Sequence, residues 1–292
     1  MSYELILGDA LGVLPGLAAG SVDAVLTDPP YAEIDRAYGR LTEAQWWELM
    51  MGVCTQVRRV LKPTGSAVFI IQPNSRKLGI MRGWVFEFMA WVCREWNMIQ
   101  DAYWWNIATM PTVHNTKFGL LRGSIKPVVW AGSPDCYRNQ EAVLWKESDE
   151  MTAQRLSGRL DNGKFPSGHS VDRSRVLSAS ERRGGVTPFN VLPMANTQGR
   201  CGHGAGTPLP LASWWTRYIC PPGGVLLDPF SGAGTMGLAA IAHGAHYIGI
   251  ERMPEYHGMA QARLGASPAP PPIIPHADLS PPTVQAELIA HA

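Results

Sequence analysis

The chain has 292 residues, 46% of them apolar, and a formal net charge of +1. A chain of this size buries a large core and needs neither a disulfide nor a metal to hold it together. Its near-neutral charge excludes a polycationic nucleic-acid coat, so any surface for nucleic acid is expected to be a local patch.

The cysteines and the apolar runs bear on compartment and on metal binding. The five cysteines form no Cys-x-x-Cys motif, and Cys201 with His203 is the only closely spaced Cys/His pair. We therefore expect reduced thiols and no metal site. No run of about eighteen apolar residues occurs, and the first residues lack the pattern of a signal peptide. These features predict a soluble, unprocessed, cytoplasmic protein.

Apolar runs and amphipathic segments alternate through the first part of the chain. A short strand is predicted at Tyr3–Leu7, and a β-branched run at Val22–Thr27 predicts a buried strand that two prolines terminate. An amphipathic pattern with Thr42 as its cap predicts a helix over residues 42–61. Next we expect a strand at 67–71, a helix within 80–96, and strands near 99–105 and 127–131. This alternation predicts an α/β fold with a doubly wound, mostly parallel sheet.

The regular pattern gives way to polar, Gly/Ser-rich sequence from residue 133 to residue 195. Residues 151–200 hold eight Lys and Arg against three acids, a local net charge of +5. This stretch is either a solvated surface insertion or a segment that follows phosphates and reads base edges. In the second interpretation, the candidates for nucleic-acid binding are Arg173, Arg175, Arg182 and Arg183.

Regular elements resume after residue 196. The patterns predict a helix at 209–219, a strand at 225–227, a helix at 233–243 and a strand at 246–250. We therefore divide the chain into residues 1–132 and 196–264, which form one folded domain, the inserted region 133–195, and a tail. The tail, 265–292, is rich in proline, and we expect it to be disordered.

The sequence Asp28-Pro29-Pro30-Tyr31 directly follows a predicted buried strand. An exocyclic amino group of a base is a poor nucleophile, because its lone pair is delocalised into the ring. A carboxylate and a backbone carbonyl held rigid by two prolines can accept hydrogen bonds from the two N–H groups of the amino group. The aromatic ring can stack on the base. The alternative is that this tetrapeptide only ends a strand in a turn.

A second pattern is a strand that runs into the Gly-rich sequence Asp228-Pro-Phe-Ser-Gly-Ala-Gly-Thr and then a helix. Glycines there let the backbone approach a ligand closely. Glu251, nineteen residues after Gly232, ends the next predicted strand and can accept from ribose hydroxyls. A tight turn with a surface Glu251 is the structural alternative. Both patterns end buried strands, where an open α/β sheet gathers its ligands, and a nicotinamide enzyme would leave the first one unexplained.

Three segments, 5–31, 203–240 and 246–264, resemble the β-class amino-methyltransferases of DNA. The resemblance implies a circularly permuted Rossmann-like fold of the S-adenosylmethionine-dependent type, with an inserted target-recognition region. It implies that Asp28, Pro29, Pro30 and Tyr31 are catalytic. It also implies a cofactor site of Asp9, Ala10, Asp28, His203, Thr207, Pro208, Asp228, Pro229, Phe230, Ser231, Gly232, Gly234, Thr235, Glu251 and Arg252.

The chain departs from this family in places. Thr207 stands where many relatives carry a lysine, so its hydroxyl is expected at the cofactor carboxylate. From the residues alone, Asp9 is equally an ordinary helix cap. Trp104 and Trp105 are the tryptophans expected to line the base pocket, and residues 32–40 are a candidate lid.

The resemblance implies methyl transfer from S-adenosylmethionine to N6 of adenine in double-stranded DNA, with the base flipped out of the duplex. N4 of cytosine is the alternative acceptor, although the family usually marks it with Ser in place of Asp28. A non-catalytic DNA-binding protein on the same scaffold is the alternative of another class, and a nicotinamide oxidoreductase is the third. The family also suggests a homodimer and a cognate restriction endonuclease as partners, which the sequence itself does not address.

Overall fold

The computed structural model describes residues 3–36, 39–77, 79–110, 117–146, 173–196 and 206–266. Its strands are β1 (Tyr3–Leu7), β2 (Val22–Thr27), β3 (Leu61–Ile70), β4 (Ser75–Lys77), β5 (Ile80–Met81), β6 (Met98–Trp105), β7 (Ile125–Gly132), β8 (Val191–Pro193), β9 (Val225–Asp228) and β10 (His246–Glu251). Its helices are α1 (Ala10–Val13), η1 (Leu14–Gly16), α2 (Glu43–Val60), α3 (Trp84–Glu95), η2 (Gln140–Val143), α6 (Arg173–Arg183), α7 (Leu209–Ile219), α8 (Thr235–His243) and α9 (Pro254–Gly265). The expected tail beyond residue 266 lies outside the described residues.

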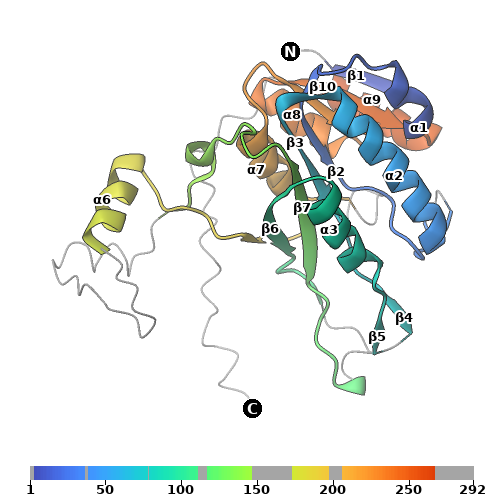
Figure 1. Ribbon diagram of the computed structural model, residues 1–292, viewed down its shortest axis with the longest axis horizontal. Helices are drawn as coiled ribbons and strands as arrows, with labels where there is room; N and C mark the ends of the chain where they lie inside the picture. Colours follow the sequence, from blue (N-terminus) through green and yellow to red (C-terminus); the bar gives the residue numbers. More distant parts are fainter. Residues whose placement is uncertain are drawn as a thin grey trace. The chain divides into compact units, whose positions relative to one another are not determined.

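The described residues fall into two compact units. The first contains residues before 140 and after 189, and it holds a sheet in the order β1-β10-β9-β2-β3-β7-β6-β8. Helices cover both faces of this sheet, with α2 and α3 on one face and α7 and α8 on the other (Figure 1). The doubly wound α/β fold predicted from the sequence is confirmed.

One strand of the sheet is antiparallel. β7 pairs antiparallel with both β3 and β6, which agrees with the mostly parallel sheet predicted from the sequence. The chain passes from β6 to β7 without a crossover helix in its described part, and a direct return of this kind places the second strand antiparallel beside the first. The amino end of β7 therefore lies at the same edge of the sheet as the carboxyl ends of β2 and β3.

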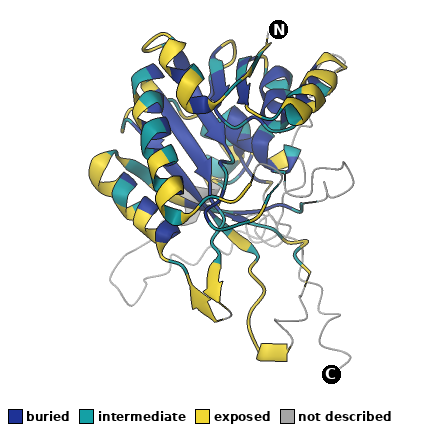
Figure 2. Ribbon diagram, turned by 90° about the vertical axis from the view of Figure 1, so that its right-hand side faces the viewer, coloured by how far each residue is buried: buried dark blue, intermediate teal, exposed yellow. Residues whose placement is uncertain are grey.

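Each face of the sheet carries its own aromatic layer. Under α2 and α3, the Trp46 ring lies 4.5 Å from Trp84 and 5.3 Å from Phe88, measured between ring centroids. On the opposite face, Trp130 of β7 lies 5.8 Å from Trp215 of α7. Burial of such large side chains is the main stabilising contribution to a fold of this kind. Figure 2 shows the buried residues concentrated on the central strands and the exposed ones on the outer helix faces.

Helix ends follow the sequence signals. Thr42 accepts from the backbone N–H of Gln45, and the Gln45 side chain accepts from the backbone N–H of Thr42, which is a complete capping box at the start of α2. Gly234 at the start of α8 has a φ of 78°, a left-handed conformation that glycine adopts without strain. The predicted helix at 233–243 therefore begins at Thr235 rather than at residue 233.

The second unit is described at 140–146 and 173–189. Within it, α6 ends at Arg183, whose guanidinium lies 3.3 Å from the Glu141 carboxylate and also donates to Thr187. The first and last residues of the expected insertion, 133–139 and 190–195, lie instead in the first unit, where β8 pairs with β6. Among the described residues, no helix is long and apolar enough to cross a bilayer.

Candidate active site

A cavity of about 620 Å³ opens at the carboxyl ends of β1, β2, β9 and β10. Such a volume is typical of pockets that hold a nucleotide-sized ligand. Residues far apart in the sequence meet there because parallel strands end at one edge of the sheet. Most of the residues expected at the site line it: Asp9, Ala10, Asp28, Pro29, Pro30, Tyr31, Thr207, Asp228, Pro229, Phe230, Ser231, Gly232, Thr235, Glu251 and Arg252.

Two expected residues are placed differently, and a third lies outside the described part of the chain. Pro208 caps the amino end of α7 and does not line the cavity. Gly234 faces α9, where an added Cβ would lie 3.1 Å from the Ala260 side chain. His203, like Cys201, lies outside the described residues. In the part of the chain that the structure describes, no group of three or more His, Cys, Asp or Glu side chains is arranged to hold a metal.

The Asp28 carboxylate receives a hydroxyl on each of its oxygens. Tyr31 Oη donates to Oδ1, and Thr207 Oγ1 donates to Oδ2 at 2.8 Å. The carboxylate plane is therefore fixed from both sides, which leaves a second lone pair on each oxygen for a ligand. Thr207, expected at the cofactor carboxylate, lines the cavity and contacts the Asp28 carboxylate.

The backbone of the Asp28–Tyr31 turn is also held in place. The indole Nε1 of Trp46, in α2, donates to the carbonyl oxygen of Pro30 at 2.7 Å. Trp46 and Tyr31 are buried, at 0% and 4% exposure, so the turn rests directly on the core. Two prolines and a buried hydrogen bond together give this turn little freedom to move.

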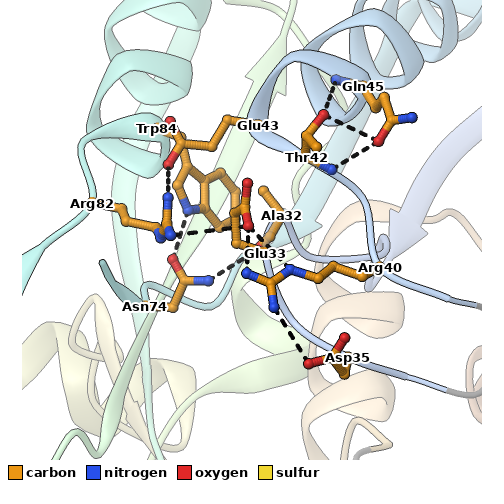
Figure 3. A network of polar contacts seen from close by, with 10 residues as sticks. All are labelled: Ala32, Glu33, Asp35, Arg40, Thr42, Glu43, Gln45, Asn74, Arg82 and Trp84. Carbon is orange, nitrogen blue, oxygen red and sulfur yellow. Dashed lines mark hydrogen bonds and ion pairs between the residues drawn. The ribbon is translucent and has the colours of Figure 1, made fainter. Parts of the chain in front are cut away.

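The loop after Tyr31 is tied down at its base (Figure 3). Asn74 Nδ2 donates to the carbonyl oxygen of Ala32 at 2.6 Å, while Asn74 Oδ1 accepts from the indole of Trp84 at 2.9 Å. Glu33 adopts a φ of 60°, which is uncommon for a residue with a Cβ, and its N–H donates to the carbonyl of Leu41 at 2.7 Å. The two ends of the candidate lid are thus joined.

Charged side chains hold the same loop (Figure 3). The Glu33 carboxylate lies 2.7 Å from Arg40 and 3.9 Å from Arg82. Arg82 also pairs with Glu43 at the start of α2, at 2.6 Å. The Arg40 guanidinium lowers the pKa of Glu33, so that the carboxylate stays charged and the network stays intact.

The Gly-rich turn is organised by Glu251. Its Oε2 accepts from the backbone N–H of Gly232 at 2.8 Å, and its Oε1 accepts from the backbone N–H of Met253 at 2.7 Å. Glu251 is 8% exposed, and its carboxylate faces the cavity with lone pairs to spare. It can therefore brace the turn and accept from a ligand hydroxyl at once.

Asp228 is a buried acid beside this turn, at 1% exposure. Thr27 Oγ1 and the N–H of Phe230 donate to its Oδ1, at 2.6 Å and 3.1 Å. Burial nevertheless raises the pKa of Asp228 to about 7, and the nearby carboxylates of Asp28 and Glu251 add to the rise. A cationic group in the cavity would reverse these effects and favour the charged form.

Two glycines make room for a buried tyrosine next to the turn. A Cβ added at Gly237 or at Gly249 would lie 2.7 Å from Cε1 of Tyr247. Tyr247 is fully buried, and its hydroxyl donates to Ser231 Oγ at 2.9 Å. Gly237, in the first turn of α8, is thus required for packing against β10, besides any role at a ligand.

Several cavity residues were missed from the sequence. Tyr256, Met259 and Arg263 line it from α9, and Arg36 lines it from the candidate lid. The spacing of three and four residues within 256–263 places these α9 side chains on one helix face, a signal that was available in the sequence. Asp9 lines the cavity and also accepts from the N–H of Leu11 at 2.9 Å, so both of its expected roles are compatible.

Trp104 and Trp105, which were expected to line the base pocket, are not among the residues around this cavity. Trp104 is fully buried, and its indole Nε1 donates to the carbonyl of Met194 at 2.9 Å. The side chain of Lys126 lies beside Tyr31. Its Nζ is 5.4 Å from the Tyr31 ring centroid and 4.7 Å from that of Trp104.

Comparison with known proteins agrees with this arrangement. Residues 22–262 match the model of the N6/N4 DNA methylase family. The chain is 26% identical to the type II methyltransferase M.PvuII of Proteus hauseri, over 87% of this chain and 81% of that protein. It is also 26% identical to the DNA adenine methyltransferase YhdJ of Escherichia coli K12, over 89% of this chain and 82% of that protein.

Solved structures show the same fold. The cytosine-N4-specific PvuII DNA methyltransferase superposes with a TM-score of 0.67 at 20% identity, covering 90% of this chain and 86% of that one. The putative DNA modification methylase TTHA0409 of Thermus thermophilus, complexed with S-adenosyl-L-methionine, gives a TM-score of 0.56 at 22% identity. The match covers 90% of this chain and 93% of that one.

Proposed function

Because the chain belongs to the N6/N4 DNA methylase family, whose methyl donor is S-adenosylmethionine, we propose that it methylates N6 of adenine in double-stranded DNA. The observation that carries the proposal is the Asp28 carboxylate, held by Tyr31 and Thr207 at the edge of the cavity. Aspartate at this position favours an adenine acceptor, because the family usually marks N4 of cytosine with a serine there.

The residues of the cavity fit this cofactor. S-adenosylmethionine carries a sulfonium, an ammonium and two ribose hydroxyls, and acidic side chains suit all of them. Asp228 and Glu251 are buried carboxylates at the Gly-rich turn, and Asp9 lies at the end of β1. We propose that Glu251 accepts from the ribose, that Asp9 faces the adenine, and that Asp228 lies at the methionine end. The bound cofactor supplies a methyl group already attached to its leaving group.

The chain's own residues prepare the target amino group. Asp28 and the backbone carbonyl of Pro29 accept hydrogen bonds from the two N–H groups of this amino group. These hydrogen bonds restore electron density to the nitrogen and point its lone pair toward the methyl group. The Tyr31 ring stacks on the base. After transfer the nitrogen carries an extra proton, which Asp28 is placed to receive. The base must first leave the duplex, at a cost on the order of a few kcal/mol that stacking and phosphate contacts offset.

N4 of cytosine is the second candidate acceptor. The likeness to M.PvuII favours it, since the PvuII methyltransferase of known structure is cytosine-N4-specific. The likeness to YhdJ, a DNA adenine methyltransferase, is equally strong by identity. Both acceptors are exocyclic amino groups and require the same two acceptor oxygens, so the geometry around Asp28 serves either.

One experiment tests the proposal. The full chain is incubated with tritium-labelled S-adenosylmethionine and unmethylated genomic DNA, and the digested nucleosides are separated by mass spectrometry. We expect N6-methyladenine, and we expect Asp28→Ala to abolish the product while cofactor affinity stays within about tenfold. N4-methylcytosine alone would replace the proposed acceptor with cytosine. No transfer at all would leave a non-catalytic DNA-binding protein, and full activity in Asp28→Ala would exclude the mechanism.

A further inference from the structure

Lys126 is a cation at the start of an otherwise apolar strand. Residues 128–132 of β7 are buried, and Lys126 precedes them opposite Trp104 in the register of β6. β7 runs antiparallel to β3, with Val128 opposite Ile70. This reversal carries Lys126 to the edge of the sheet where β2 ends and the Asp28 turn begins.

The ammonium of Lys126 lies against two aromatic rings. Its Nζ is 4.7 Å from the Trp104 ring centroid and 5.4 Å from that of Tyr31, distances at which a cation is attracted to the face of an aromatic ring. The same Nζ donates to Tyr31 Oη at 3.4 Å. Burial lowers the pKa of Lys126, Arg36 lowers it further, and the charge of Asp28 raises it.

The chemistry of an ammonium decides how the Tyr31 hydroxyl is oriented. An ammonium has donors and no acceptor, so beside it the tyrosine oxygen can only accept. The single proton of Tyr31 is then directed to Oδ1 of Asp28, to which the hydroxyl donates. Thr207 fixes Oδ2 independently, from the segment before α7. Without the cation, the Tyr31 hydroxyl could rotate away, and Asp28 would lose one of the two donors that hold its plane.

We propose that Lys126 is a positioning residue for methyl transfer, which acts through the hydroxyl of Tyr31 to orient the Asp28 carboxylate toward the target amino group. The inference rests on the proposed role of Asp28, and it holds for an adenine or a cytosine acceptor alike. It differs from the ordinary role of a lysine in such an enzyme, which is contact with a DNA phosphate.

A double-mutant cycle on the full chain separates these roles. The single variants are Lys126→Met, which keeps an unbranched side chain without its charge, Lys126→Arg, which keeps the donors, and Tyr31→Phe. The double variant combines Lys126→Met with Tyr31→Phe. Each is assayed for kcat and KM with labelled S-adenosylmethionine and duplex DNA. Thermal melting and cofactor binding confirm that each variant is folded.

We expect Lys126→Met to lower kcat by about tenfold with KM for DNA within about threefold, and Lys126→Arg to recover most of the loss. In the Tyr31→Phe background, adding Lys126→Met should change kcat by less than about twofold, because the hydroxyl through which it acts is gone.

Three results would overturn the inference: an unchanged kcat in Lys126→Met, a loss that appears only in KM for DNA, or the same fold-loss in both backgrounds. Failure of the proposed function is distinct, because it would show as absence of transfer by the unsubstituted chain. In that case the proposed role of Lys126 would fail together with the proposed function.

Discussion

The hydroxyl of Thr207 donates to Oδ2 of Asp28 at 2.8 Å, joining residues 179 positions apart in the sequence. Thr207 is 3% exposed and lies just before α7. This contact connects the two parts of the sequence whose convergence the proposed function requires. Thr207 thus holds the Asp28 turn in this chain.

Replacing Thr207 with valine should lower kcat. Valine keeps the shape of the side chain but removes the donor, so Asp28 keeps only the Tyr31 hydroxyl to hold its plane. A hydrogen bond to a charged group contributes about 1.5–3 kcal/mol, and we expect kcat to fall by about tenfold or more. Thr207→Ser, which retains the hydroxyl, should stay within about threefold. Steady-state methyl transfer measures both, and equal kcat values in the two variants would show that the hydroxyl has no such role.

The pKa of Asp228 makes the stability of the fold depend on pH. Burial raises this pKa to about 7, above the ordinary range of a carboxyl. Between about pH 4 and 7 the folded chain therefore holds a proton that the unfolded chain has released, and the free energy of unfolding falls as pH rises through this window. This contribution is fully present below about pH 4 and is lost above about pH 7.

Asp228→Asn removes that ionisation while keeping an oxygen for the donors at Oδ1. Relative to the unsubstituted protein, the variant should gain roughly 2 kcal/mol in the free energy of unfolding between pH 5 and pH 7, at about 1.4 kcal/mol per pH unit. Chemical denaturation without added cofactor measures this difference. Asp135→Asn, at an exposed position, provides the control for removal of one carboxylate. Parallel pH curves for Asp228→Asn and the unsubstituted protein would show that Asp228 is ionised in the fold.

Much of the fold could be predicted because its signals are local. The apolar run of β2 ends at two prolines, and α2 begins at a capping box, so their positions follow from short stretches of sequence. The direction of β7 could not be predicted in this way. It depends on how the chain returns from β6, and no residue within the strand itself encodes that path.

The site was predictable to the same extent. The Asp28 turn and the Gly-rich turn each have a local signature, whereas contacts across the sheet have none. Lys126 looks like an ordinary surface lysine in the sequence, and only the reversal of β7 brings it to Tyr31. Trp104 was expected at the base pocket, but it is fully buried near the carboxyl end of β6.

A single methyl group at two glycines should change stability in opposite directions. At Gly237 of α8, an added Cβ would lie 2.7 Å from the buried ring of Tyr247 and 3.0 Å from Leu264, so Gly237→Ala should cost about 1–3 kcal/mol through overpacking. At Gly258 of α9, nothing lies within 4 Å, and the position is exposed. Gly258→Ala should therefore stabilise by about 0.5–1 kcal/mol, because alanine favours the helix. Thermal or chemical denaturation compares the two, and a gain from Gly237→Ala would contradict the tight packing.

The second unit carries the arginines proposed to bind DNA, and the structure distinguishes two of them. Arg182 is exposed, and its described hydrogen bond goes to the carbonyl of Ser178 in the same helix, at 3.3 Å. Arg183 is instead 3.3 Å from Glu141 and also donates to Gln140 and Thr187, so an acid within the unit already compensates its charge.

Arg182→Gln should therefore weaken DNA binding more at low salt than at high salt. Each phosphate contact that is lost reduces the slope of log Kd against log salt concentration by about one. Arg183→Gln should change this slope by less, since its charge is paired, while lowering the stability of the unit. Arg94→Gln, at an exposed position in the last turn of α3, is the matched control for removal of one charge. Binding of duplex DNA titrated at several salt concentrations measures all three, and a slope that Arg182→Gln leaves unchanged would place the phosphate contacts on another surface.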